Sequence, residues 1–159
     1  MNAKRITQRG LFFEEFELET VYEHSPGRTV TEADNVLFTT LTMNTQSLHL
    51  DAEWAATTEF GERLVNSMFT LATMVGLSVA QLTQGTIVAN LGFDSVSFPH
   101  PVRHGDTLTA ETTILSKRLS SSRPGQGIVV FEHVARIQTG EVVARAVRST
   151  LMRCAPSEA

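Results

Sequence analysis

Hydrophobic residues dominate a long stretch near the middle of the chain. Between residues 64 and 82 they recur so often that they would surround a helix on every side. They are Leu64, Val65, Met68, Phe69, Leu71, Ala72, Met74, Val75, Leu77, Val79 and Leu82. A helix that is apolar all round is buried all round, and this stretch is too short for a typical membrane-spanning helix. The pattern therefore predicts a central core helix enclosed by the rest of the domain.

Four long strands are predicted after this helix, over residues 86–98, 107–117, 127–138 and 141–152. They are separated by PHPVRHGD, by SSSRPGQ and by a tight turn at Thr139-Gly140. Consecutive strands with short connections favour an antiparallel sheet. Because one hydrophobic helix precedes this sheet, the simplest packing curls the sheet around the helix. We therefore expect an α+β hot-dog fold.

The first third of the chain predicts shorter elements. Residues 11–22 have the composition of a strand and lead into a turn at residues 25–27. Thr31, with a carboxylate three residues later, forms a capping-box pattern that predicts a helix over residues 32–43. A short helix over residues 51–56 follows, with Asp51 expected at its start as an N-terminal cap or dipole partner. One face of the first helix is predicted to carry Val36, Leu37, Thr40 and Leu41.

Composition limits the class of protein. The chain has 159 residues, 42% hydrophobic and 19% charged, which predicts a single domain over residues 1–159. The net charge is −4 with both signs interspersed, which does not favour nucleic acid or an anionic membrane as partner. A single cysteine, Cys154, suits a reducing compartment. The first ten residues do not lead into the apolar segment of a signal peptide, so we expect a cytoplasmic protein.

A histidine and an asparagine precede the short helix, in the sequence TMNTQSLHLD of residues 42–51. Histidine titrates near neutral pH and so suits general acid or base chemistry, which makes His49 a candidate. Asn44 can hold a water molecule by hydrogen bonds. Polar residues ahead of helices more often serve as caps. From these residues alone, a catalytic pair and a capping region both remain open.

Three motifs together resemble the MaoC-like hydratases, the (R)-specific enoyl-CoA hydratase group of the hot-dog superfamily. The family pattern D-x-N-P-L-H-x-D corresponds to residues 44–51, and the segment that opens the family's central helix corresponds to residues 66–68. The P-V-x-x-G-D-T-L feature stands at residues 101–108. Their order and spacing follow the family over about residues 28–152. The resemblance implies a hot-dog fold and chemistry on CoA thioesters.

Two positions depart from the better-known members. Asn44 stands where they have an Asp that shares the activation of water, and an amide takes no proton at neutral pH. Ser67 replaces a Gly but keeps the backbone N–H. One branch of the family shares these features and is similar to hydratases acting on mesaconyl-CoA or itaconyl-CoA. This chain matches that branch at residues 64–71, 89–94 and 122–129.

The resemblance also implies roles for single residues. His49 would be the acid/base and Asn44 would orient the water. The backbone N–H groups of Ser67 and Met68, at the positive end of the central helix, would form an oxyanion hole for the thioester oxygen. Asn66 would contact the substrate.

Cationic side chains are further candidates for binding acyl-CoA. Arg103 and His104 lie in the P-V-x-x-G-D segment and would suit a free substrate carboxylate. The simpler interpretation is that they are charged residues of a solvent-exposed loop. Lys117, Arg118 and Arg123 flank the SSSRPG turn and would suit the CoA phosphates, with a solvated turn as the alternative.

The sequence therefore predicts a hydro-lyase that adds or removes water across the 2,3 double bond of a short dicarboxylyl enoyl-CoA. No metal or redox cofactor is expected, because the sequence has neither a ligand cluster nor a Gly-rich dinucleotide loop. A homodimer or higher even oligomer is expected, since one small curled sheet leaves an edge open. Two alternatives remain: an acyl-CoA thioesterase, and a non-catalytic acyl-CoA-binding subunit in which Asn44 marks a lost activity.

Overall fold

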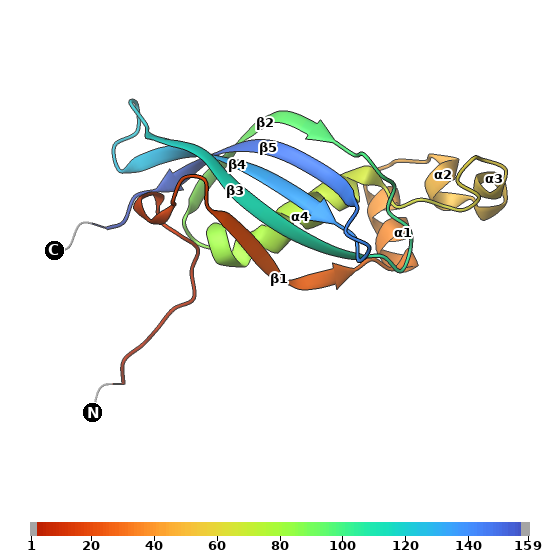
Figure 1. Cartoon of the computed structure of the whole chain (residues 1–159), viewed down its shortest axis with the longest axis horizontal. Helices are drawn as coiled ribbons and strands as arrows, with labels where there is room; N and C mark the ends of the chain where they lie inside the picture. The colour runs from red at the N-terminus through yellow and green to blue at the C-terminus, as the bar shows by residue number, and fades with distance from the viewer. Residues whose placement is uncertain (1–2, 157–159) are drawn as a thin grey trace.

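One curved antiparallel sheet packs against a long helix in the computed structural model, which describes residues 3–156 (Figure 1). In chain order the elements are the 3₁₀ helix η1 (Phe13–Glu15), β1 (Val21–Thr29), α1 (Glu32–Leu41), α2 (Ser47–Leu50), α3 (Ala52–Ala56), α4 (Ser67–Leu82), β2 (Ile87–Ser97), β3 (Thr107–Leu119), β4 (Gln126–Arg136) and β5 (Val142–Arg153). The strand order is β1-β3-β4-β5-β2, and every neighbouring pair is antiparallel. The predicted α+β arrangement of sheet and central helix is confirmed.

The four C-terminal strands confirm the sequence prediction to within two residues at each end. The hydrophobic core lies between these strands and α4, in two clusters. One surrounds Met74 and the other surrounds Leu82, and both side chains are fully buried. The core therefore fixes α4 along the sheet and leaves its N-terminal end beside α1 and α2 (Figure 1).

The predicted N-terminal strand is wrong. Residues 11–22 contain the 3₁₀ helix η1, and β1 begins only at the end of this range. β1 also runs through residues 25–27, where a turn was predicted, and its pairing with β3 shifts register there. Phe13 and Phe16 are buried because they pack onto the core cluster around Leu82, which a local pattern does not reveal.

Side-chain caps begin α1 and α3 as predicted. The hydroxyl of Thr31 accepts the backbone N–H of Asp34 at 3.2 Å, and the Asp34 carboxylate accepts the N–H of Thr31 at 2.8 Å. Asp51 accepts the N–H of Trp54 at 2.9 Å. Helix α1 ends at Leu41, two residues before the predicted end.

The predicted apolar face of α1 is largely exposed. Leu37 and Leu41 are 60% and 73% exposed, whereas Asn35 and Thr39 are fully buried. The buried face of α1 is polar because Asn35 and Thr39 accept hydrogen bonds from Asn66, which anchor α1 to the start of α4.

Helix α4 is not enclosed on all sides, which corrects the prediction from its composition. Met68 is 48% exposed, and Ala72, Gly76 and Ala80, at four-residue intervals on the same face, are also exposed. Within the described chain, the sheet covers only the opposite face of the helix. None of the helices in residues 3–156 is long and apolar enough to span a membrane.

Candidate active site

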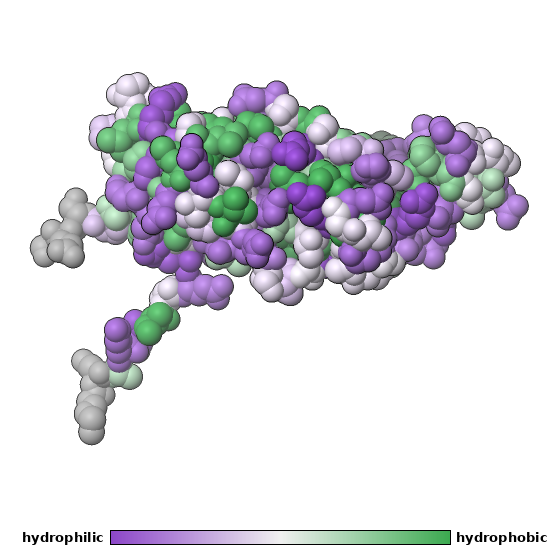
Figure 2. All heavy atoms as spheres, in the orientation of Figure 1, coloured by the Kyte–Doolittle hydropathy of each residue, from purple (hydrophilic) through white to green (hydrophobic). Residues whose placement is uncertain are grey.

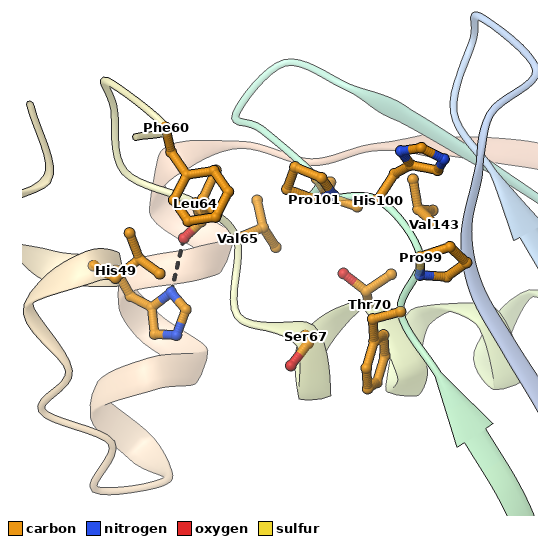
Figure 3. A pocket seen from close by; sticks show the side chains of 13 residues that line it. His49, Phe60, Leu64, Val65, Ser67, Thr70, Pro99, His100, Pro101 and Val143 are labelled. Atoms are coloured by element: carbon orange, nitrogen blue, oxygen red, sulfur yellow. Dashed lines mark hydrogen bonds between the residues drawn. The ribbon is translucent and has the colours of Figure 1, made fainter. Parts of the chain in front are cut away.

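A cavity of about 330 Å³ lies at the N-terminal end of α4, beside α2 and the loop from β2 to β3 (Figure 3). It is lined by Leu48, His49, Phe60, Leu64, Val65, Ser67, Thr70, Phe98, Pro99, His100, Pro101, Val102 and Val143. Most of these side chains are apolar. Apolar walls with a few polar groups are typical of small-molecule sites.

His49 is held in one orientation at the edge of this cavity. Its Nδ1 lies 2.9 Å from the carbonyl oxygen of Leu64. Because a carbonyl only accepts hydrogen bonds, Nδ1 carries the proton of the neutral imidazole, which leaves the lone pair on Nε2. None of the described protein groups hydrogen-bonds to Nε2. Figure 3 shows the ring beside the open space that the Ser67 side chain also faces. Nε2 is therefore available as a base.

The first turn of α4 brings one free backbone donor to the cavity. Asn66 caps the helix, and its Oδ1 accepts the N–H of Met68 at 3.0 Å. Ser67 is the first helical residue, so its N–H has no acceptor within the helix. Of the two N–H groups predicted to form an oxyanion hole, that of Met68 is already bonded within the chain and that of Ser67 is free.

Asn66, which was predicted to contact the substrate, is an interior residue. It is only 3% exposed. Its backbone N–H donates to Asn35 Oδ1 at 2.8 Å, and its Nδ2 donates to Thr39 Oγ1 at 3.3 Å. These two hydrogen bonds connect the start of α4 to α1.

Asn35 is a residue of this region that the sequence did not indicate. Its Nδ2 lies 3.2 Å from the Leu64 carbonyl oxygen, 3.4 Å from the His49 carbonyl oxygen and 3.0 Å from His104 Nε2. The Leu64 oxygen that holds His49 thus also accepts from Asn35. A polar residue on an apparently ordinary helix gives no local signal of such a role.

Asn44 does not line the cavity. Its Oδ1 accepts the N–H of Gln46 at 3.1 Å, and its own N–H donates to the Thr39 carbonyl at 3.0 Å. The structure shows no hydrogen bond between Asn44 and His49. Asn44 shapes the turn that leads into α2, and its side-chain NH₂ is not used by that turn.

The cationic candidates near the site have partners within the chain. Arg103 Nε donates to Glu62 at 2.7 Å, and His104 contacts Asn35. Neither residue lines the cavity. Burial lowers the pKa of His104, and the nearby Arg63 lowers it further, against the opposing effect of Glu32 and Glu62.

The other cationic candidates lie far from His49. Arg118 and Arg123 are exposed near the hairpin between β3 and β4, at the opposite end of the molecule from α2 (Figure 1). Lys117 donates to the carbonyl of Phe16 at 2.6 Å and so holds the N-terminal segment on the sheet. Within one chain, these residues are not brought to the cavity.

A second group of buried polar side chains lies along the sheet. Nε2 of His24 is 2.7 Å from Thr112 Oγ1, which is 2.7 Å from Nδ1 of His133. Nδ1 of His24 is 2.7 Å from Gln81 of α4. Burial, together with the charge of Arg148 and the neighbouring His24, lowers the pKa of His133 to about 3.

Residues 3–156 contain no group of three or more His, Cys, Asp or Glu side chains that could hold a metal ion. The expected absence of a metal or other cofactor stays a prediction.

Comparison with known proteins agrees with the motifs at this site. A protein-family model described as the MaoC like domain matches residues 14–136 of the sequence. This range includes α1, His49, the whole of α4 and the β2–β3 loop. The chain belongs to the MaoC-like domain family. The resemblance drawn from the sequence motifs is therefore confirmed.

Curated relatives of this MaoC-like chain have names that specify CoA thioesters. The mesaconyl-CoA hydratase of Haloarcula marismortui is 32% identical over 146 residues, covering 91% of this chain and 40% of the relative. The β-methylmalyl-CoA dehydratase of Chloroflexus aurantiacus is 30% identical over 154 residues, covering 96% and 42%. The chain spans about two fifths of the length of these two relatives.

Solved structures confirm the fold of the MaoC-like chain. A Mycobacterium tuberculosis protein described as a double hot-dog fold superimposes with a TM-score of 0.83 at 22% identity, over 94% of this chain and 46% of that one. The predicted hot-dog fold is therefore confirmed.

Proposed function

We propose that this MaoC-like chain is a hydro-lyase that adds water to, or removes it from, the 2,3 double bond of a short enoyl-CoA thioester. One observation carries the proposal: the free Nε2 of His49 and the free N–H of Ser67 belong to residues of the same apolar cavity. The first is a base for water and the second is a donor for the thioester oxygen. The names of the relatives support the same chemistry.

In the hydration direction, His49 Nε2 accepts a proton from water as the water oxygen bonds to C3. The electrons of the double bond move toward C2 and the thioester carbonyl, whose oxygen gains negative charge. The Ser67 N–H and the dipole of α4 stabilise that charge. His49 then returns its proton to C2, so that the product contains one added water and the imidazole is neutral again.

Asn44 is proposed to orient the water. Its Oδ1 is engaged with Gln46 N–H, so the free NH₂ would donate to the water oxygen while His49 takes a proton from it. The amide then serves as a positioning group, and proton transfer depends on His49 alone.

The proposed substrate is a branched C5 dicarboxylyl thioester of the mesaconyl-CoA or itaconyl-CoA type. Support comes from motifs shared with that branch and from the relatives' names. Since hydration changes no oxidation state overall, the proposal includes no redox cofactor, and CoA enters only as part of the substrate. A cytoplasmic location is part of the same proposal.

A homodimer, or a higher even oligomer, is proposed as the working form. Strand β2 is an edge of the sheet, and its exposed hydrophobic residues are Val88, Leu91, Phe93 and Val96. Figure 2 shows hydrophobic surface along the edge where β2 lies in Figure 1. Exposed strand edges are usually covered, and the uncovered face of α4 consists mainly of small residues that allow close helix packing.

The direct test is turnover of crotonyl-CoA, mesaconyl-CoA and itaconyl-CoA, with mass spectrometry to detect the addition of one water. We expect a mesaconyl- or itaconyl-type ester to be hydrated fastest. The variant His49→Ala should lose at least about a hundredfold in rate, since a positioned acid/base contributes on this order.

Thiol release in the same reactions separates the alternatives. Free CoA without hydrated ester would indicate a thioesterase. Binding of the esters without either product would indicate a non-catalytic acyl-CoA-binding subunit and would overturn the proposal. A hydrated ester with no His49 dependence would leave the activity standing but remove His49 as the base.

A further inference from the structure

Asn35 is fully buried at a point where three segments of the chain meet. Its Oδ1 lies 2.8 Å from the backbone N of Asn66, and its Nδ2 lies 3.2 Å from the carbonyl oxygen of Leu64. A backbone N–H can only donate and a carbonyl can only accept. These two contacts therefore fix which end of the Asn35 amide carries oxygen.

The same amide orientation determines the protonation state of His104. Its Nε2 lies 3.0 Å from the NH₂ of Asn35, so Nε2 must accept a hydrogen bond. The imidazole is then neutral, with its proton on Nδ1. His104 is thus the outer acceptor of a network whose inner end is the carbonyl that holds His49.

We propose that Asn35 is a positioning residue for the reaction, and that it holds this position only while His104 is neutral. The inference rests on the proposed hydratase function. Through one carboxamide, Asn35 fixes the Leu64 carbonyl that orients His49 and the backbone of Asn66, which precedes the Ser67 donor. The base and the oxyanion donor are thereby set relative to each other.

Protonation of His104 would break this arrangement. Nε2–H would then face the NH₂ of Asn35, donor against donor. Rotation of the amide would relieve that contact but would place Oδ1 against the Leu64 oxygen and leave the Asn66 N–H facing an NH₂. Either outcome displaces a group that orients the site.

Charged groups around His104 come from two neighbouring segments. Arg63 and Glu62 lie just before α4, and Glu32 lies on α1, where it pairs with Arg63. Burial, with the charge of Arg63, lowers the pKa of His104, while the two carboxylates oppose that effect. His104 is therefore neutral at pH 7, and the network becomes sensitive only in acid.

The first experiment removes the amide. Asn35→Ala should lower kcat for the best enoyl-CoA by about 10- to 100-fold with a smaller change in KM, because small misplacements of catalytic groups have effects of this size. Thr39→Val is the matched control: Thr39 is equally buried on α1 and its side chain hydrogen-bonds to Asn35 and Asn66, but not to the Leu64 carbonyl. It should reduce kcat much less.

The state of His49 provides a readout that needs no substrate. Long-range ¹H–¹⁵N spectra of the wild type should show His49 with its proton on Nδ1. In Asn35→Ala the two tautomers should mix, whereas in Thr39→Val they should not. This result is independent of whether the substrate has been identified, so a failed hydratase assay and a failed positioning role give different data.

The second experiment uses pH. Under the proposal, both His49 and His104 must be deprotonated for activity. A plot of log kcat/KM against pH should therefore approach a slope of about 2 on its acid side in the wild type. In His104→Gln, whose amide oxygen still accepts from Asn35 but takes no proton, the slope should fall to about 1. Equal slopes in both proteins, or an unchanged His49 tautomer and kcat in Asn35→Ala, would overturn the proposal.

Discussion

Nδ1 of His49 lies 2.9 Å from the carbonyl oxygen of Leu64, and this contact leaves Nε2 as the basic nitrogen. The backbone of Leu64 also donates to the Leu48 carbonyl at 3.1 Å, which ties α2 to the segment that leads into α4. His49 and the start of α4 are therefore parts of one hydrogen-bonded unit. Changes at the first turn of α4 should affect the chemistry without detaching His49.

Replacement of Ser67 by proline tests the single free donor. Proline lacks an N–H but is favoured at the first position of a helix, and the extended backbone of Asn66 before it is compatible with proline. We expect Ser67→Pro to fold and to lose about a hundredfold or more in kcat. Ser67→Ala keeps the N–H and should stay within about threefold of the wild type. Similar rates for both variants would rule out this N–H as the oxyanion donor.

Asn44→Ala tests the orientation of water. The substitution should lower kcat about tenfold with little change in KM, because the water would be less well placed while the base remains. Thr45→Ala, at an exposed neighbouring position in the same loop, is the control. Thermal melting of both variants would show whether a lower kcat in Asn44→Ala comes instead from unfolding, since this variant also loses the hydrogen bond to Gln46 N–H. An unchanged kcat in Asn44→Ala would limit Asn44 to a structural role.

The buried His133 should make stability depend on pH. Its pKa is about 3 in the folded chain, whereas an unfolded histidine titrates near 6.5. Between these values the unfolded chain binds more protons, so the free energy of unfolding should decrease as pH falls from about 6.5 toward 3. Urea unfolding across this range measures the decrease. His133→Gln, which keeps a polar group for Thr112, should flatten it. The same pH dependence in the variant would contradict the assignment.

Gly76→Arg tests whether the exposed face of α4 is covered by a second copy of the chain. Within the described chain nothing lies within 4 Å of a Cβ added at Gly76, so the variant should fold. Light scattering should show the wild type as a dimer or larger even oligomer and the variant as a monomer. Ala33→Arg, at an exposed position of α1, should leave the mass unchanged. A monomeric wild type would contradict the proposed homodimer.

The four C-terminal strands and the helix caps were predictable because the sequence patterns that specify them are local. Strands β2 to β5 have hydrophobic patterns of sufficient length and clear turn residues between them, and the caps at Thr31 and Asp51 depend on neighbours only three residues away. Phe13 and Phe16 were misassigned because their burial depends on strands more than a hundred residues later.

The site was predictable only in part. The motifs identified His49 and Ser67, and the structure places both on one cavity. The role proposed for Asn35 depends on contacts with residues 49, 64, 66 and 104, which no spacing rule connects. The bonded N–H of Met68 likewise follows from the rotamer of Asn66, which the sequence does not specify.

The buried row of His24, Thr112 and His133 also restricts how the strands can align. These side chains come from β1, β3 and β4 and meet at 2.7 Å across each boundary. A slip of one residue in either pairing would turn one partner to the other face of the sheet and leave buried imidazole nitrogens without a partner. Apolar side chains tolerate some sliding, whereas this row does not. Correct strand alignment is therefore selected by hydrogen-bond geometry as well as by hydrophobic burial.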